Sequence, residues 1–257
     1  MKYLNSFMIA VMVFTLAACS SQPAPTPEPT SPPLPTITST PERTSTPLPP
    51  IATVEPSPTP DPLIFKDDFE GSLGEGWNWT KENKKTWSLT NNPGWLEIMA
   101  RSGKIGNGDL SNILLRPIPE GNFEIETQMN FKPISDYQIA GLLIYESAAN
   151  YLLFGRAFCD SPDFCANDGF YMDLSTDGNL DGQNFATPAE KTEISFLRLR
   201  GEANLYTAYA SHDGQEWKLI GEKSSEMKPM FIGLMAGQSL SAPQPAQFDY
   251  FEVNQVP

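Results

Sequence analysis

Positive charge is scarce in this sequence. The 257 residues include 17 Lys and Arg against 31 Asp and Glu, which gives a formal net charge of −14. Nucleic acids and anionic lipid headgroups are held by basic surfaces that neutralise phosphates. The composition therefore argues against both as electrostatic partners, and we expect no nucleic acid to bind. An acidic surface suits neutral partners or cations.

Signatures of nucleotide binding and nucleophilic catalysis are also missing. The sequence has no phosphate-binding loop and no dinucleotide fingerprint, and its one histidine is His212. The run Ser211-His212-Asp213 is not a catalytic triad, because neighbours on an extended strand point to opposite faces. This run predicts a tight turn instead.

Paired carboxylates offer one route to an enzyme. Glu124 and Glu126 would share a face of a predicted strand, about 6.5–7 Å apart along the backbone. Flexible side chains could bring them to the ~5–5.5 Å of a retaining glycosidase. Gln128 interrupts the acidic ladder that some sandwich-fold glucanases carry on one strand. We therefore favour a solvated strand face over a glycoside hydrolase and leave enzymatic activity open.

Long apolar runs are absent as well. The run Phe7–Ala18 follows a start that carries Lys2, and it is too short for a membrane-spanning helix, which needs ~20 residues. This order predicts a secretory signal peptide over residues 1–18. The end of this run together with the next residue, Leu16-Ala17-Ala18-Cys19, resembles the lipobox of bacterial lipoproteins. That resemblance implies a lipid anchor at Cys19 and an extracytoplasmic, membrane-anchored position at the cell envelope or surface; an ordinary signal peptide with a stray cysteine is the alternative.

Aromatic residues are missing between Cys19 and Phe65, where proline is abundant. Residues 22–62 hold 15 of the 25 prolines, interleaved with Thr and Ser. Proline removes a backbone donor and fixes φ, so neither helix nor sheet can propagate. We expect residues 19–62 to form a disordered stalk, and some 40 residues in polyproline extension would reach roughly 100 Å.

From Leu63 to Pro257 the composition is that of a globular domain. Apolar and polar residues alternate with period two, turn-forming residues lie between the runs, and no helical stripe exceeds two turns. The predicted strands are 95–101, 122–131, 138–146, 150–158, 169–174, 193–200, 204–211, 216–221, 230–237 and 247–253. Short antiparallel strands without helices must bury their apolar faces on one another. We therefore expect an all-β fold, a jelly-roll sandwich of two antiparallel sheets.

The remaining cysteines lie close together. Export favours oxidation, and five residues separate Cys159 from Cys165, enough to close a small disulfide loop. A metal site is the rival interpretation, although no histidine lies nearby. We expect the disulfide, within a long loop over residues 159–191.

Several motifs of this domain resemble a known family. They are "FKDDFEGSLGEGWNWTKENKKTWSLTNNPGWLEI", "NILLRPIPEGNFEIETQMNFKPISDYQIAGLLIYESAANYLLFGRA", "FLRLRGEANLYTAYASHDGQEWKLIGE" and "QFDYFEV". They resemble the concanavalin A-like domains at the C-terminus of family 43 β-xylosidases, which implies a concanavalin A-like sandwich over residues 63–257. In those enzymes the module helps to shape the active site of a neighbouring domain, and no catalytic domain is recognised before this one.

The resemblance also implies a metal. Concanavalin-like sandwiches often hold a structural calcium where the first and last strands meet, and Asp68 and Asp249 are the matching acids. A pair of edge-strand aspartates bonded to loop backbone is the alternative. A second calcium candidate begins at Asp177, but the twelfth position of that loop is Pro188 instead of a bidentate glutamate.

Sugar recognition needs aromatic faces and polar groups that bind hydroxyls. If Ala140, Leu142 and Ile144 face inward, Tyr145 faces outward, and Leu197 and Leu199 place Arg198 outward in the same way. Arg156 falls on the inward side, where it needs a partner carboxylate. The candidate carbohydrate-binding set on a concave face is Tyr145, Arg156, Tyr171 and Arg198, with Trp79 or Trp95 at the rim.

These observations predict a surface-anchored, non-catalytic lipoprotein whose β-sandwich binds a poly- or oligosaccharide. An envelope structural or protein-interaction module, docking a partner through loop 159–191, is the alternative. A glycoside hydrolase is less favoured.

Overall fold

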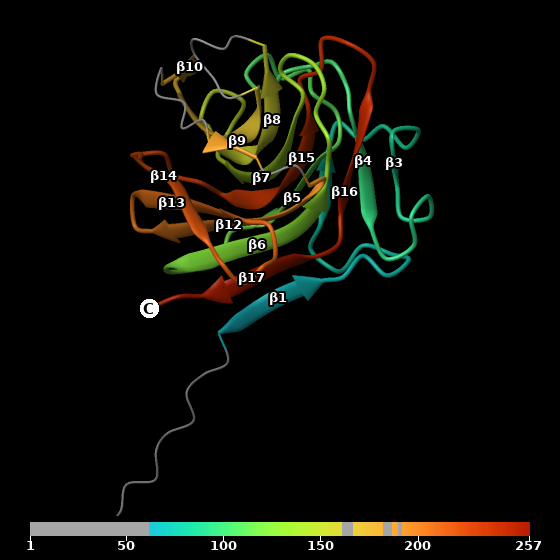
Figure 1. Cartoon of the computed structure of the whole chain (residues 1–257). Coiled ribbons are helices and arrows are strands. Elements are labelled where there is room, and N and C mark those ends of the chain that lie inside the picture. Colours follow the sequence, from blue (N-terminus) through green and yellow to red (C-terminus); the bar gives the residue numbers. More distant parts are fainter. Residues whose placement is uncertain (1–61, 161–166, 182–186, 190–191) are drawn as a thin grey trace, which may run out of the picture. The chain divides into compact units, whose positions relative to one another are not determined.

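The described part of the chain is built from strands. The computed structural model describes residues 62–160, 167–181, 187–189 and 192–257. Over these ranges every regular element is a β-strand, and the strands form two antiparallel sheets (Figure 1). None of the described residues belongs to a helix long and apolar enough to cross a membrane. The predicted all-β sandwich is confirmed.

Sheet A contains nine strands. Their bounds are β1 (Leu63–Asp67), β3 (Trp87–Ser88), β4 (Leu96–Ala100), β6 (Phe123–Asn130), β12 (Ile194–Glu202), β13 (Leu205–Ser211), β14 (Lys218–Ser224), β16 (Gln244–Phe248) and β17 (Phe251–Gln255). The order is β14-β13-β12-β6-β16-β4-β3, and β17 lies between β6 and β1. Strand β6 is long enough to pair with β17 along its first half and with β16 at its end.

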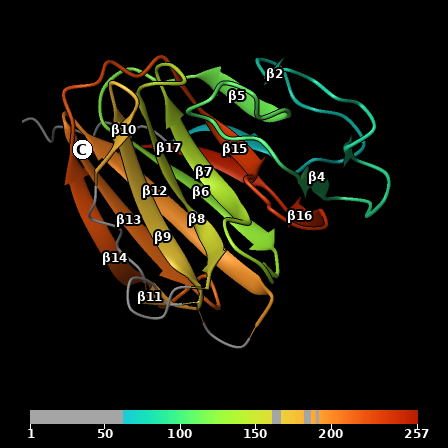
Figure 2. The same ribbon diagram turned by 90° about the horizontal axis from the view of Figure 1, so that it is seen from above.

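Sheet B contains eight strands. Their bounds are β2 (Asn78–Thr80), β5 (Ile113–Pro117), β7 (Ile139–Tyr145), β8 (Tyr151–Cys159), β9 (Asn167–Thr176), β10 (Asn179–Leu180), β11 (Thr187–Pro188) and β15 (Phe231–Gly237). The order is β10-β9-β8-β7-β15-β5-β2, with β11 beside β9. Figure 2 shows β7, β8 and β9 lying across β6, β12 and β13.

The main core lies between the two sheets, and the period-two pattern creates it. Alternate residues of β12, such as Leu197 and Leu199, are fully buried, and so are Leu142 and Ile144 of β7. Their neighbours along the same strands point to the opposite faces. The alternation that predicted the strands therefore also selects the core.

Sheet B is apolar on its outer face too. Leu143, Leu153 and Met235 form a second buried cluster there, together with Ile105 and Leu110 from the connection between β4 and β5. Because both faces of β7 and β8 are covered, these strands have nearly continuous apolar sequences. The outer face of sheet B is therefore a layered, partly enclosed surface.

Two glycines bring the central strands of sheet B unusually close. Gly141 of β7 lies opposite Gly155 of β8. A Cβ on Gly141 would run into the backbone of Phe154, and one on Gly155 would run into the backbone of Ala140. Only glycine permits this approach.

One strand prediction needs correction. The predicted strand 247–253 is two strands, β16 and β17, which break at Asp249 and Tyr250. At the break the Asp249 amide donates to the Gln128 carbonyl, and Thr127 Oγ1 donates to the Tyr250 carbonyl at 2.5 Å. At this break the chain stops pairing with the end of β6, through β16, and begins to pair with its first half, through β17. The short strands β1, β2, β3, β5, β10 and β11 had no predicted counterpart, and strands of two or three residues are too short to show alternation. Residues 159–191, expected as one long loop, contain β9, β10 and β11.

Candidate functional site

A cavity of about 360 Å³ lies on the outer face of sheet B. Strands β7 to β10, the β4–β5 connection and the turn before β7 all contribute to its walls. Its lining includes aromatic, charged and hydroxyl side chains: Lys104, Tyr137, Tyr151, Tyr171, Asp173 and Ser175. Its volume falls at the lower end of the ~300–1,000 Å³ typical of ligand pockets. We call it the sheet B cavity.

Strand β9 supplies the polar side of this cavity. Tyr171, Asp173 and Ser175 alternate along β9 and therefore share one face. In the ladder to β8, Asp173 lies opposite Leu153, and Ser175 lies opposite Tyr151. A single carboxylate is thus flanked by a tyrosine and a serine and faces an apolar strand.

One oxygen of the Asp173 carboxylate lacks a hydrogen-bond partner among the described residues. Within the described part of the chain its Oδ1 is buried and has no hydrogen-bond partner. Burial raises the pKa of Asp173 to about 6; the nearby charge of Lys223 lowers this pKa and that of Asp181 raises it. Buried polar atoms in folded proteins almost always have a partner. An acceptor at the wall of a cavity without one marks a place where a ligand donor would be stabilised.

The cation whose charge lowers the pKa of Asp173 already has a carboxylate partner. Lys223 Nζ lies 2.7 Å from both carboxylate oxygens of Asp181. Lys223 comes from β14 of sheet A and its side chain is 3% exposed, whereas Asp181 follows β10 of sheet B. This ion pair joins the edges of the two sheets, and the Lys223 charge still lowers the pKa of Asp173.

The neighbouring hydroxyls point to backbone carbonyls. Tyr171 OH donates to the Asn167 carbonyl at 3.0 Å, and Ser175 Oγ donates to the Ala149 carbonyl at 2.9 Å. Burial raises the pKa of Tyr151, and the Asp173 charge acts in the same direction. At the rim, Tyr137 is 53% exposed and Lys104 Nζ lies 5.5 Å from its ring centroid.

A second buried atom has no hydrogen-bond partner among the described residues, Arg116 Nη1. The Arg116 guanidinium stacks on Phe65, 3.1 Å from the ring centroid, and burial lowers its pKa to about 10. Arg116 does not line the sheet B cavity, and its delocalised charge rests against aromatic rings. We therefore assign Arg116 to packing and Asp173 to the candidate site.

The six predicted carbohydrate-binding residues do not share one surface. Tyr171 lines the sheet B cavity, and Tyr145 packs in the same outer cluster, opposite Tyr151 in the ladder. The other four lie elsewhere. Arg156 points between the sheets, Arg198 belongs to sheet A, and Trp79 and Trp95 lie at the flanks of sheet B and sheet A. Asp173 was missed; its signal is a lone acid in phase with Tyr171 and Ser175 in "GFYMDLS".

Arg156 lies between the sheets. Its Nε and Nη2 bind the two carboxylate oxygens of Asp168, each at 2.7 Å, and Nη1 donates to the Thr192 carbonyl at 2.5 Å. This bidentate pair is the partner that an inward arginine requires. The geometry makes Arg156 a structural link between β8, β9 and β12.

Arg198 lies on the outer face of sheet A, over the Trp217 ring at 3.8 Å. It binds Glu126 at 2.7 Å, and Arg200 binds Glu124 at 2.8 Å. Tyr250 OH donates to the other oxygen of Glu126 at 2.6 Å. Both candidate catalytic carboxylates are therefore held by arginines. This differs from the expected solvated strand face, because the Glu124 and Glu126 side chains are only 10% and 18% exposed.

The two tryptophans lie at the flanks of sheet A and sheet B. Trp79 of β2 packs against the main core and against Trp87, with ring centroids 4.8 Å apart. Trp95 is half-buried immediately before β4, and its amide donates to the Asn92 carbonyl. Neither tryptophan lines the sheet B cavity.

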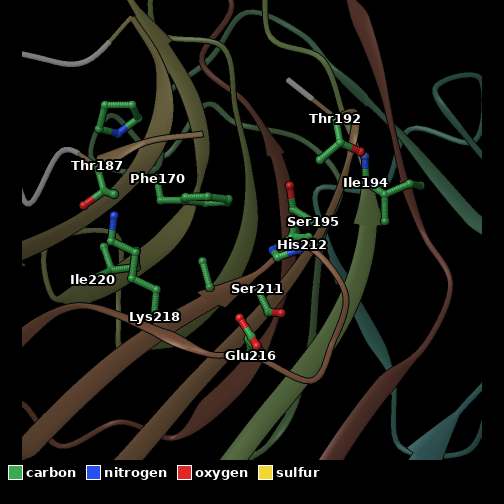
Figure 3. A pocket seen from close by; sticks show the side chains of 12 residues that line it. Phe170, Thr187, Thr192, Ile194, Ser195, Ser211, His212, Glu216, Lys218 and Ile220 are labelled. Atoms are coloured by element: carbon green, nitrogen blue, oxygen red, sulfur yellow. Dashed lines mark hydrogen bonds between the residues drawn. The ribbon is translucent and has the colours of Figure 1, made fainter. Parts of the chain in front are cut away.

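A smaller pocket of about 90 Å³ opens between the sheets. Figure 3 shows Ser195, Ser211, His212 and Glu216 around it. Ser211 Oγ donates to Asp213 Oδ1 at 3.0 Å and receives the Gly214 amide, as in a tight turn. His212 Nε2 lies 3.7 Å from Asp213, so these three side chains do not form a relay. The pocket is below the ~300 Å³ at which ligand pockets begin.

The predicted calcium ligands lie where the first and last strands meet. Asp68 pairs with Lys66 at 2.8 Å, and burial raises the pKa of Asp249, which the Asp68 charge raises further. Among the described residues no group of three or more His, Cys, Asp or Glu side chains is placed to hold a metal. Ca²⁺ takes six to eight oxygens, so calcium here stays a prediction. Asp177 and Gly178 form the turn between β9 and β10.

Two of the predictions about cysteines concern residues outside the described part of the chain. Cys19, the predicted lipidation site, and Cys165, the predicted disulfide partner of Cys159, are not among them. Cys159 ends β8 and packs against the outer cluster of sheet B. The lipid anchor and the disulfide stay predictions.

Several proteins of known structure share this fold. BlXynB of Bacillus licheniformis, a GH43 protein, is 20% identical with a TM-score of 0.66, over 74% of this chain and 39% of that one. A xylan β-1,4-xylosidase of Bacillus halodurans C-125 is 20% identical with a TM-score of 0.64, again over 74% and 39%. A functionally unknown protein of Saccharomyces cerevisiae is 13% identical with a TM-score of 0.54, over 71% of this chain and 97% of that one. These likenesses show the fold.

The chain spans about two fifths of the length of the two bacterial proteins. No curated protein matches it. Residues 66–254 match the family of β-xylosidase C-terminal concanavalin A-like domains. The match covers most of the chain and the whole sandwich between β1 and β17. The chain therefore belongs to the family of concanavalin A-like domains found at the C-terminus of β-xylosidases.

Proposed function

We propose that this protein is a non-catalytic carbohydrate-binding module that a lipid at Cys19 holds at a bacterial cell surface. The observation that carries the proposal is the sheet B cavity, whose lining combines tyrosines with a carboxylate that has one oxygen unpartnered by any described residue. Family membership supports it, because related domains belong to proteins that act on sugars. The stalk expected over residues 19–62 would hold the sandwich away from the membrane.

The chemistry of the cavity suits a sugar. Sugar rings present C–H faces that pack on aromatic side chains and hydroxyl groups that donate hydrogen bonds. Tyr137, Tyr151 and Tyr171 supply aromatic surface, and Asp173 supplies an acceptor. Glu124 and Glu126 are tied to arginines, so the described residues favour binding over hydrolysis.

The proposal is tested by binding to neutral glycans. The mature chain in detergent should bind at least one of xylo-oligosaccharides, arabinoxylan and xyloglucan in affinity gels and calorimetry. Tyr137→Asn should weaken that binding roughly 2- to 12-fold, the worth of one aromatic contact. Asparagine tolerates the backbone of Tyr137, whose φ is 64°.

Tyr209→Ala is the matched control. Tyr209 lies opposite Arg198 in sheet A, away from the residues that line the cavity, so its loss should leave binding unchanged. The absence of binding to every glycan in the panel would contradict the proposed function.

A further inference from the structure

The sheet B cavity also indicates what kind of sugar it accepts; this step rests on the proposed function. We propose that Asp173 recognises the ligand, and that the ligand is a neutral sugar presenting hydroxyl donors, with acidic sugars rejected.

The first step concerns donors. On β9 the hydroxyls that flank Asp173 donate to backbone carbonyls, Tyr171 to Asn167 and Ser175 to Ala149. Lys223 donates to both oxygens of Asp181. The described surroundings thus direct their donors elsewhere, and Asp173 Oδ1 receives none. A donor from outside the chain would complete this wall, and adjacent sugar hydroxyls bind a carboxylate well.

The second step concerns charge. Two acids, Asp173 and Asp181, face one base, Lys223, so this group carries one net negative charge when all are ionised. A uronic acid carboxylate brought beside Asp173 would meet like charge in a partly desolvated site. Lys104, the cation at the rim, is exposed and lies over Tyr137, so water and salt screen it. The net negative charge of Asp173, Asp181 and Lys223 therefore determines which ligands are accepted, and it favours neutral ones.

The third step concerns shape. Apolar groups, including Ile139 and Ala157, line the cavity together with the tyrosines. A ligand with one apolar side and one donor side fits this division, and a pyranose or furanose ring has both. A small cation would satisfy Asp173 but would leave the apolar side unused. The cavity as a whole thus fits a sugar ring better than an ion.

The test compares matched oligosaccharides and matched variants by calorimetry at pH 8, with the mature chain in detergent. The probes are xylohexaose and cellohexaose, which are neutral, and hexagalacturonic acid, which is anionic. Wild type should bind a neutral probe, and the anionic one at least tenfold more weakly. Asp173→Asn should weaken the neutral complex roughly 10- to 150-fold, the worth of hydrogen bonds to a charged acceptor. Its fold is checked by thermal unfolding, where no loss of stability is expected.

Asp177→Asn is the control. Asp177 is exposed on the turn after β9, and its substitution removes the same charge outside the sheet B cavity. It should bind like wild type. Neutral binding that survives Asp173→Asn, or equal binding of the anionic probe, overturns this inference and leaves the proposed function standing. Failure of wild type to bind any of the three probes overturns it as well, and failure across the wider glycan panel overturns the proposed function with it.

Discussion

Asp173→Asn should stabilise the folded protein by up to about 3 kcal/mol at pH 8. In the wild type a carboxylate is buried with an unsatisfied oxygen, and burial raises its pKa from 3.8 to about 6. One pKa unit corresponds to ~1.4 kcal/mol, so this difference corresponds to about 3 kcal/mol. Asparagine removes the charge and keeps the size of the side chain.

The effect should depend on pH in a defined direction. Because the pKa of Asp173 is higher in the folded state than in the unfolded state, folding favours the protonated acid. The penalty is present in full above pH ~6 and disappears as the pH falls below ~4. Stability differences between wild type and Asp173→Asn, measured by urea unfolding from pH 4 to 8, should rise with pH.

Asp177→Asn serves as the control for this measurement and should show a flat, small difference across the same range. A variant Asp173→Asn less stable than wild type at pH 8 would contradict the assignment. Combined with weaker sugar binding, the expected result would mean that Asp173 costs stability while it serves recognition, a trade-off common at binding sites.

Asp168→Asn should have the opposite and larger effect, a loss of about 3–5 kcal/mol, the usual cost of breaking a buried ion pair. The Arg156 side chain is 3% exposed and that of Asp168 is 34% exposed. Removing the aspartate charge leaves a guanidinium in the interior, where water cannot replace the lost partner. Chemical unfolding at pH 7 measures the loss.

Arg156→Met gives the matched comparison. Methionine fills much of the same volume, and the remaining Asp168 is exposed enough to be hydrated. We therefore expect Arg156→Met to cost about 1–2 kcal/mol, mainly for the hydrogen bonds to the Thr192 and Glu193 carbonyls. A larger loss of stability in Arg156→Met than in Asp168→Asn would show that the buried charge of Arg156 is not the main cost of breaking this pair.

The strands and the fold class could be predicted from the sequence, because the alternation of apolar and polar residues is a local property. Leu142 and Ile144, or Leu197 and Leu199, indicate their own strand and its buried side without reference to the rest of the chain. The break between β16 and β17 could not be predicted, since it depends on Gln128 and Thr127 of β6, more than a hundred residues away.

The candidate site could be predicted from the sequence only in part. Alternation correctly places Tyr145 on the outer face of sheet B and Arg156 on the inner one. It does not reveal that the β4–β5 connection covers this outer face and encloses Asp173. The need of Arg156 for a carboxylate is a local inference, but its partner Asp168 is identified only by the three-dimensional arrangement of β8 and β9.

The pairing of β1 with β17 has a consequence for engineering. Leu63 lies opposite Asn254, and the Gln255 amide donates to the Pro62 carbonyl at 2.6 Å, so the two ends of the sandwich meet. A short linker between them would close the domain into a ring. New ends could then be opened at the tight turn after β12, where Ala203 has a φ of 51°. The domain is thus a natural candidate for circular permutation, with the sheet B cavity untouched.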